Sequence, residues 1–240
     1  MPNQKEVQVS ETIIKSEFRG PPDCGNGGYV GGTLAAELDC RCASVKLKRP
    51  TPLDKSLKMV KTPDGAIKLL DGNLVIAQAE STEIDVSLPD IPDWQACEEA
   101  SETGGAGQES PYAYCFACGR LHPNGLQVLT GPVELRKIVA AAWIPKSGFG
   151  DAEGYLPDRF VWAALDCPGG FALAHTVSNE KFVTGSISVK IDAPIRVGEH
   201  YRVLGWHEGV DGRWQIAATA LVDETGKPLA VCRSRWLQVN

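Results

Sequence analysis

The sequence predicts an α+β protein made of two similar units, in each of which a curved antiparallel sheet wraps a central helix. Three observations predict this fold: a weak internal repeat, a series of short strands that closes each copy, and one helix-like stretch before each series. The 240 residues leave room for one large domain or two small ones, so the length agrees with a duplicated unit.

The repeat relates residues 44–50 to residues 188–194. Both segments carry Ser, Val, Lys and Pro at the same positions, with Leu in one where the other has Ile. Runs of alternating apolar and polar residues follow each copy, separated by Asp-Gly or Gly-Lys turns typical of β-hairpins. These runs cover 57–61, 66–70 and 73–79 in the first half, and 201–206, 214–222 and 229–239 in the second. Each half is therefore expected to end in an antiparallel meander.

One helix is expected ahead of each meander. The first, over 26–38, opens on Asn26, a residue type favoured at the N-cap of a helix, and continues into alanines and leucines. The second begins at Pro157 and Asp158 and runs into 160–165, which is apolar on every side. A helix that is apolar all round is buried, so we expect two long central helices.

The segment 88–112 between the two units is rich in Pro, Gly and acidic residues and shows no hydrophobic period. We interpret it as a linker between an N-terminal unit over 1–87 and a C-terminal unit over 113–240. A single hairpin-rich half would bury too little apolar surface on its own, so the two sheets are expected to pair edge to edge.

Composition excludes several partners. The chain has 24 basic and 30 acidic residues and a formal charge of −6, which argues against nucleic acid as a ligand. The apolar run at 139–144 is far too short to span a membrane, and no signal peptide is visible at the N-terminus. We therefore expect a cytoplasmic protein whose eight cysteines are mostly reduced.

The segment 24–32 is the most unusual in composition, with five glycines in nine residues. Glycines in the first turns of a helix are costly, and two uses would explain them: backbone amides that hold an oxyanion or a thioester carbonyl, or close packing of the helix. A phosphate loop is disfavoured because the Lys and Ser/Thr of such loops are missing. Asp166 lies inside the apolar run 161–167, so it is either hydrogen-bonded structurally or acts as a base or nucleophile.

No metal and no cofactor are expected. Cys115 and Cys118 have the spacing of half a zinc site, but a second pair with matching spacing is missing. Cys167 is interpreted as a core thiol, because no base can be placed beside it, and the four histidines as surface or loop residues. The motifs of α/β hydrolases, dinucleotide-binding folds and kinases are absent.

Two local patterns resemble the hotdog thioesterases. The segment 26–30 (NGGYV) is similar to the start of the N-terminal hotdog helix in type II acyl-CoA thioesterases, and 115–126 (CFACGRLHPNGL) resembles the Cys-Phe-x-Cys-Gly…Asn-Pro-x-Gly-Leu opening of another hotdog thioesterase subfamily. In this chain His122-Pro123-Asn124 replaces the usual Asn-Pro order. The resemblance implies a double hotdog in which the two units act together.

The resemblance also implies a thioesterase with a composite site between the halves. The amides at Asn26, Gly27 and Gly28 would polarise the thioester carbonyl, Asn26 would alternatively orient the water, and Tyr29 is expected to contact the substrate. Asp166 would activate water or attack directly. Thr184 stands where type II thioesterases place a hydroxyl partner.

This chain departs from the family pattern at three places. Hotdog thioesterases commonly carry a glycine pair seven residues before the acid, but Asp158 and Arg159 stand there ahead of Asp166. Asp39 follows Gly32 at the family spacing, yet it is expected at the end of its helix and ranks second as the acid. The companion Gln on the last strand has no counterpart in 232–235.

The implied partner is an acyl-CoA or another acyl thioester, and the resemblance allows a homo-oligomer of double hotdogs. Arg19, Arg41 or Lys181 would attract the anionic carrier. Two other hypotheses remain: a non-catalytic hotdog protein that binds an acyl ligand or regulates, and a hotdog dehydratase or hydratase, which is disfavoured because no histidine stands at a helix start.

Overall fold

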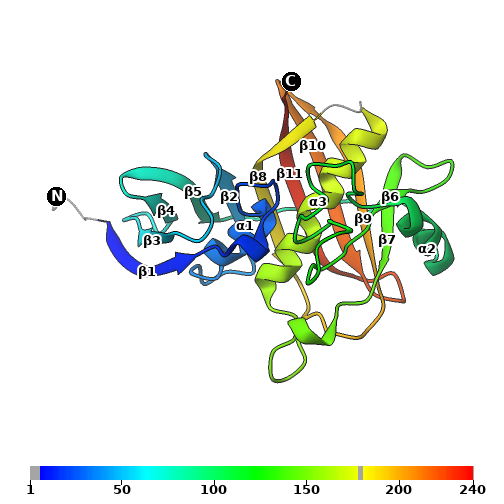
Figure 1. Ribbon diagram of the computed structural model, residues 1–240, viewed down its shortest axis with the longest axis horizontal. Helices are drawn as coiled ribbons and strands as arrows, with labels where there is room; N and C mark the ends of the chain where they lie inside the picture. Colours follow the sequence, from blue (N-terminus) through cyan, green and yellow to red (C-terminus); the bar gives the residue numbers. More distant parts are fainter. Residues whose placement is uncertain (1–5, 178–180, 240) are drawn as a thin grey trace.

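The computed structural model describes residues 6–177 and 181–239. In these residues eleven strands form one antiparallel sheet in the order β1-β3-β4-β5-β2-β8-β11-β10-β9-β7-β6 (Figure 1). The strands are β1 (Val7–Ile13), β2 (Cys42–Leu47), β3 (Ser56–Lys61), β4 (Ile67–Asp71), β5 (Leu74–Ser81), β6 (Gly131–Pro132), β7 (Ile138–Trp143), β8 (Lys181–Ile191), β9 (Tyr201–Asp211), β10 (Trp214–Val222) and β11 (Pro228–Val239). The helices are α1 (Gly27–Ala35), α2 (Trp94–Thr103) and α3 (Asp158–Thr176), with short 3-10 turns at Ser16–Phe18 and Ser147–Phe149. The predicted α+β class is therefore correct.

The two halves of the chain meet in the middle of this sheet. Strands β1 to β5 form one side, strands β6 to β11 form the other, and the antiparallel β2–β8 pair joins them. The two repeat segments lie at this junction, because Ser44 of β2 stands directly opposite Ser188 of β8. Both meanders are also present, as β3-β4-β5 and as β9-β10-β11.

Helix α1 is shorter than expected. Asn26 caps it as predicted, with its side chain accepting a hydrogen bond from the Tyr29 N–H, but the helix ends at Ala35 and spans nine residues. The expectation of a helix to residue 38 was wrong, because the Glu37 and Leu38 N–H groups bond the carbonyls three residues back, at Leu34 and Ala35, and the chain turns there. Four of the nine helical residues are glycines, which cost roughly 1 kcal/mol each relative to Ala. The short helix is held by its contact with α3, not by its own propensity.

Helix α3 is long, central and buried, as its apolar sequence predicted. It spans 19 residues and packs on the face of the sheet formed by β7 to β11 (Figure 1). Pro168 inside the helix removes one backbone donor. The neighbouring carbonyl of Leu165 is satisfied by the Thr219 hydroxyl at 2.8 Å, and Gly205 of β9 has no side chain where the Pro168 carbonyl approaches. The helix can therefore press closely against the sheet in spite of the proline.

The segment interpreted as a linker contains α2, which the sequence analysis missed. Asp93 caps this helix by accepting a hydrogen bond from the Ala96 N–H at 2.9 Å. Only Cys97 and Ala100 of the helix are buried, so its apolar stripe is too narrow to give a clear period. The helix lies beside β6 and β7 at the right-hand end of the sheet in Figure 1.

Strands β7, β9 and β10 carry buried residues on both faces. One face packs against α3, and the other belongs to a cluster formed with α2 and the 84–91 segment. On β7, Ala141 and Trp143 lie in the core around α3, whereas Ile138 and Ala140 belong to the cluster with α2. The period of two along a strand places neighbouring residues on opposite faces. This end of the sheet is therefore the middle layer of three.

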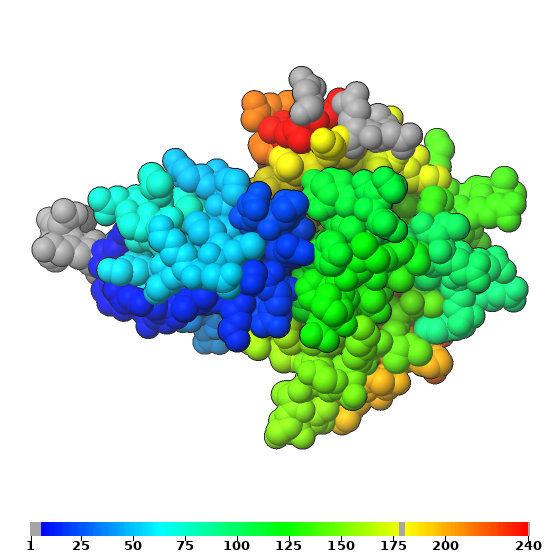
Figure 2. Space-filling model, in the orientation of Figure 1, coloured from blue at the N-terminus to red at the C-terminus, as the bar shows by residue number. Residues whose placement is uncertain are grey.

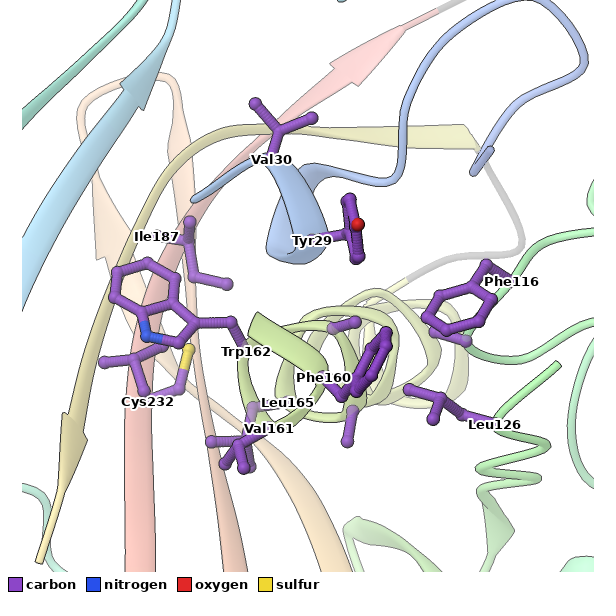
Figure 3. Packing of buried hydrophobic residues seen from close by; sticks show 14 of the residues in the cluster. Tyr29, Val30, Phe116, Leu126, Phe160, Val161, Trp162, Leu165, Ile187 and Cys232 are labelled. Carbon is purple, nitrogen blue, oxygen red and sulfur yellow. The ribbon is translucent and has the colours of Figure 1, made fainter. Parts of the chain in front are cut away.

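The main core lies between α1, α3 and the sheet (Figure 3). Trp162 points from α3 toward Ile187 of β8 and Cys232 of β11, while Tyr29, Phe116 and Phe160 gather on the other side of α3 (Figure 3). Complete burial of a large apolar side chain contributes about 1.5–3 kcal/mol, so this cluster locks α1 to α3. Among the described residues, no helix has both the length and the apolar character needed to cross a bilayer.

Candidate active site

The N-terminus of α1 points at the middle of α3. Asn26 is buried, and its side chain caps α1 through the Tyr29 N–H at 2.9 Å. Gly28 contacts α3 so closely that a Cβ on it would lie 2.3 Å from the Trp162 carbonyl oxygen. The glycines therefore serve close packing, one of the two uses left open by the sequence, and the packing is of helix on helix.

The side chain of Asp166 lies at the N-terminus of α1 and accepts a hydrogen bond from it. Its Oδ2 accepts the Gly28 N–H at 2.9 Å, and the Asn26 Nδ2 lies 3.4 Å from the same oxygen. Asp166 is 4% exposed, so these donors replace most of the water around its carboxyl group. A carboxylate at a helix N-terminus is also stabilised by the helix dipole.

Thr184 completes the group from β8. Its hydroxyl donates to Asp166 Oδ1 at 3.1 Å, so both carboxylate oxygens are held by protein donors. Three of the residues singled out from the sequence, Asn26, Thr184 and Asp166, therefore meet at one point although they come from two ends of the chain. Their chemical roles stay predictions.

Burial and hydrogen bonding act on the acid in opposite directions. Burial is the larger effect and raises the pKa of Asp166 to about 6, while the hydrogen bonds from Gly28 and Thr184 lower it. The nearby Cys115 thiol adds a smaller upward contribution. The pKa of the carboxyl group is therefore shifted toward neutral pH, as is common for groups that exchange protons in catalysis.

Asp166 and Thr184 line a cavity of about 800 Å³. Its walls come from the loops before α1 and after β2, from the 106–118 segment, from α3 and from the start of β8. In Figure 2 the blue N-terminal residues and the green residues of the middle segment lie side by side on one face, where the Phe116 N–H donates to the Arg19 carbonyl at 2.8 Å. The cavity is therefore built from both halves of the chain.

The lining of the cavity is mixed. Apolar walls are provided by Leu47, Phe171, Phe182 and Trp236. Three basic residues also line it, namely Lys48, Arg49 and Lys181. A cavity of this size and composition fits a ligand with an apolar part and an anionic part.

Two predicted substrate contacts are not in this cavity. Tyr29 stacks on Phe18 with ring centroids 4.1 Å apart and is buried in the aromatic cluster, so its side chain serves packing. Gly28 does not line the cavity either, because its N–H donates to Asp166 Oδ2. Gly27 does line the cavity. In the described residues the Gly27 N–H has no hydrogen-bond partner, because it occupies the first position of α1.

Of the remaining residues singled out from the sequence, only Lys181 lies at the cavity. Asp39 lies beyond the end of α1, in agreement with its lower rank. Arg19 covers the ring of Tyr114 and donates to its carbonyl oxygen, and neither Arg19 nor Arg41 lines the cavity. Lys181 does, so one of the three basic candidates is near the site.

A cysteine cluster that the sequence did not predict lies beside Asp166. The sulfur atoms of Cys115, Cys118 and Cys167 lie within 4.8 Å of one another, and all three residues line the cavity. Cys167 is thus not the isolated core thiol that the sequence suggested, since its Sγ lies 3.7 Å from that of Cys115. No spacing along the chain could reveal this, because the loop and α3 meet only in the fold.

The N-terminus of α3 forms the counterpart of the site in the other half. A smaller cavity of about 330 Å³ lies there, between Gly32, Glu37, Asp158 and Arg159. Asp166 is the ninth residue after the N-cap of α3, and the ninth after the N-cap of α1 is Ala35. The second position therefore lacks the buried acid.

Comparison with known proteins gives the fold. No protein-family model matches the sequence, and none of the curated proteins is similar to it. Among solved structures, a candidate thioesterase II from Thermobifida fusca aligns over 98% of this chain and 96% of its own with 14% identity and a TM-score of 0.61. A candidate thioesterase from Novosphingobium aromaticivorans aligns over 98% of both chains with 12% identity and a TM-score of 0.60. A protein of unknown function with a hot dog fold from Alicyclobacillus acidocaldarius covers 98% and 96%, with 11% identity and a TM-score of 0.59. The chain therefore has a hotdog fold.

Proposed function

We propose that this hotdog chain is an acyl thioester hydrolase that acts on acyl-CoA or a related thioester, at one composite site of a double hotdog. The observation that carries the proposal is the buried Asp166 carboxylate, held by the Gly28 N–H at 2.9 Å and by Thr184 at 3.1 Å at the edge of a cavity. A fixed carboxylate, a helix N-terminus and a cavity together suit acyl transfer to water.

The way the two halves are built supports the double hotdog. Helix α1 packs mainly on strands β2, β4 and β5 of its own half and also contacts β8, helix α3 packs on strands of the other half, and β2 pairs with β8. Gly28 and Asp166 come from opposite halves, 138 residues apart. The site is therefore complete only when both units are joined.

In the proposed reaction, Asp166 takes a proton from a water molecule that lies near Thr184, and the water oxygen attacks the thioester carbonyl carbon. The negative charge that develops on the carbonyl oxygen is stabilised by the Gly27 N–H and the positive end of α1. This assigns the oxyanion contact to Gly27, since the Gly28 N–H is already bound to Asp166. The carbon–sulfur bond then breaks, the leaving thiolate takes the proton from Asp166, and the acid product departs.

Activation of water fits this site better than direct attack by Asp166. Both carboxylate oxygens accept hydrogen bonds from the protein, and Asp166 is 4% exposed. A carboxylate fixed in this way can accept a proton through a short contact, whereas attack on carbon would require it to leave its donors. The cavity offers Phe171 and Phe182 to an acyl chain and Lys48 and Lys181 to an anionic carrier.

The test is thiol release from a panel of acyl-CoA substrates. The wild type is expected to release CoA from part of the panel, and Asp166→Asn is expected to lower kcat by about 10²–10⁴-fold, the usual contribution of a general base. The isosteric Asn can still accept the Gly28 N–H, so the fold is retained. Asp158→Asn on the same helix is the matched control and should keep wild-type turnover, because Asp158 lies in the smaller cavity. Equal turnover by wild type and Asp166→Asn would refute the role of Asp166.

One observation favours a second candidate, a non-catalytic acyl-binding protein. The hydrogen bonds to Asp166 are all internal, and they tie α1 to α3 and β8, which is what a structural carboxylate would do. Calorimetric binding of an acyl-CoA without release of thiol from any member of the panel would establish this alternative.

A further inference from the structure

Three cysteines meet at the wall of the main cavity. Cys115 and Cys118 come from the loop ahead of β6, and Cys167 comes from α3 directly after Asp166. Their sulfur atoms lie within 4.8 Å of one another, and the Cys115–Cys167 pair is 3.7 Å apart. Zinc–sulfur bonds of about 2.3 Å in a tetrahedron place neighbouring sulfurs about 3.8 Å apart. The thiols therefore already have close to the spacing of metal ligands.

A buried side chain places a donor near two of the three sulfurs. The Asn26 Nδ2 lies 3.9 Å from Cys115 Sγ and 3.8 Å from Cys167 Sγ, and Asn26 is buried. Such donors around the ligand sulfurs orient them and tune the metal.

The loop that carries Cys115 and Cys118 is rigid without any metal. The Gly119 N–H donates to the Cys115 carbonyl at 2.9 Å, and the Ala106 N–H donates to the Cys118 carbonyl at 2.9 Å. Gly119 could not carry a side chain, because a Cβ there would lie 2.5 Å from the Ala113 carbonyl oxygen. The ligands are thus held in place by the fold, which lowers the entropic cost of binding an ion.

A disulfide explains the cluster less well. A disulfide has its sulfurs about 2.05 Å apart, so Cys115 and Cys167 at 3.7 Å are two separate thiols. A disulfide would also involve only two of the three neighbouring sulfurs and would not account for the position of the third. Three convergent thiols with four-coordinate spacing correspond instead to one ion.

We propose that Cys115, Cys118 and Cys167 bind a zinc ion, with the fourth coordination position open to the main cavity. All three residues line that cavity, so water or a sulfur or oxygen atom of a ligand can reach the ion. Three protein ligands with one open position are the arrangement of catalytic zinc sites, whereas structural sites are closed by a fourth residue. The sequence predicted no metal because it contains no second cysteine pair with matching spacing; the third ligand, Cys167, lies on α3. The proposal does not depend on thioesterase activity.

The first experiment measures metal on the whole protein. Protein purified without chelators under reducing conditions is expected to contain about one zinc per chain by elemental analysis. After removal of zinc, Co²⁺ should give a sulfur-to-cobalt charge-transfer band and the intense visible bands of tetrahedral cobalt, with saturation at one equivalent. Cys115→Ser and Cys167→Ser should each lose these bands and the bound zinc. Cys97→Ser is the control, since Cys97 is a buried thiol that belongs to α2 and lies outside the cluster.

A second measurement uses only the wild-type chain, so it holds even if a variant fails to fold. Added Zn²⁺ should slow the alkylation of Cys115, Cys118 and Cys167 at least about tenfold, as read by peptide mass spectrometry, and leave Cys40 unchanged. Three results would overturn the proposal: no saturable Co²⁺ binding by reduced wild type, equal metal binding by Cys167→Ser and Cys97→Ser, or equal alkylation with and without Zn²⁺. A stable Cys115–Cys167 disulfide in protein that binds no metal would identify a redox pair instead.

Discussion

Ser44 and Ser188 stand opposite each other across the β2–β8 pair, and their hydroxyls are joined by a hydrogen bond of 2.9 Å. The two residues are also the first members of the internal repeat, 144 residues apart. The repeat therefore pairs with itself, and the contact between the halves is made by equivalent residues. This is the isologous pattern of a symmetric dimer, here within one chain.

The first prediction tests this junction by a double-mutant cycle. Ser44→Ala and Ser188→Ala each leave one half-buried hydroxyl without its partner, so each should lower the free energy of unfolding by about 0.5–1.5 kcal/mol. The double variant should lose less than the sum, because the second change removes a group that is already unpaired. Chemical denaturation of the four proteins measures the coupling, and strict additivity would mean that the hydrogen bond contributes nothing.

The second prediction concerns Gly28. Because an added Cβ would lie 2.3 Å from the Trp162 carbonyl oxygen and 2.8 Å from Ala163 Cα, Gly28→Ala must push α1 away from α3. We expect a loss of about 1–3 kcal/mol of stability together with loss of the Gly28–Asp166 hydrogen bond. Gly107→Ala is the control, since nothing lies within 4 Å of its added Cβ. A Gly28→Ala protein as stable as Gly107→Ala would contradict the packing role.

The third prediction separates the hydroxyl of Thr184 from its bulk. Thr184→Val keeps the shape of the side chain but removes the donor to Asp166 Oδ1, whereas Thr184→Ser keeps the donor. If Thr184 positions the acid and the water, Val should lower kcat at least about tenfold with little change in KM, and Ser should restore most of it. Thr33→Val, which removes a hydroxyl on α1 that bonds the Tyr29 carbonyl, serves as control. Equal rates for the Val and Ser variants would show that the hydroxyl plays no part.

The fourth prediction is a pH dependence of stability that originates at His122. Its Nδ1 faces the Asn124 N–H at 3.2 Å and must accept, so Nε2 carries the proton and donates to the Glu17 carbonyl at 2.9 Å. Burial lowers the pKa of His122, while the Glu17 carbonyl and the charges of Cys115 and Glu17 raise it and Arg19 lowers it.

Because the folded pKa of His122 lies below the unfolded value of about 6.5, the unfolded chain takes up the proton first as the pH falls. Stability from this residue is complete above the unfolded pKa and decreases as the pH drops below it. Urea titrations at pH 7.5 and 5.5 should show a larger loss for wild type than for His122→Gln, which cannot titrate. Identical losses in the two proteins would exclude His122 as the source.

Signals contained in short segments predicted part of this structure. The sequence predicted two sheets that pair edge to edge, and the structure shows that the repeat segments themselves form this junction as β2 and β8. Asn26 and Asp166 were found because a capping residue before glycines and a carboxylate in an apolar run are both unusual locally. Each of these signals is contained in a short segment.

The cysteine cluster and the close packing of Gly28 could not be predicted from the sequence, because both depend on contacts between distant segments. Cys167 and Cys115 are 52 residues apart and meet only where the loop packs on α3. The close contact of Gly28 with Trp162 is equally invisible, since either residue alone is compatible with many neighbours. Strand β1 was missed for another reason: it is an edge strand, mostly exposed, and its apolar residues do not mark an inner face.

The position of β2 and β8 at the centre of the sheet has a consequence for the order of folding. Their pairing closes a loop of more than 100 residues, and contacts of such sequence separation form slowly, because loop-closure entropy must be overcome first. During synthesis, the edge of β2 that does not pair with β5 stays unpaired until β8 has left the ribosome. Gly28 and Asp166 are likewise 138 residues apart, so the first appearance of an intact Gly28–Asp166 contact would report a long-range step in the folding of this chain.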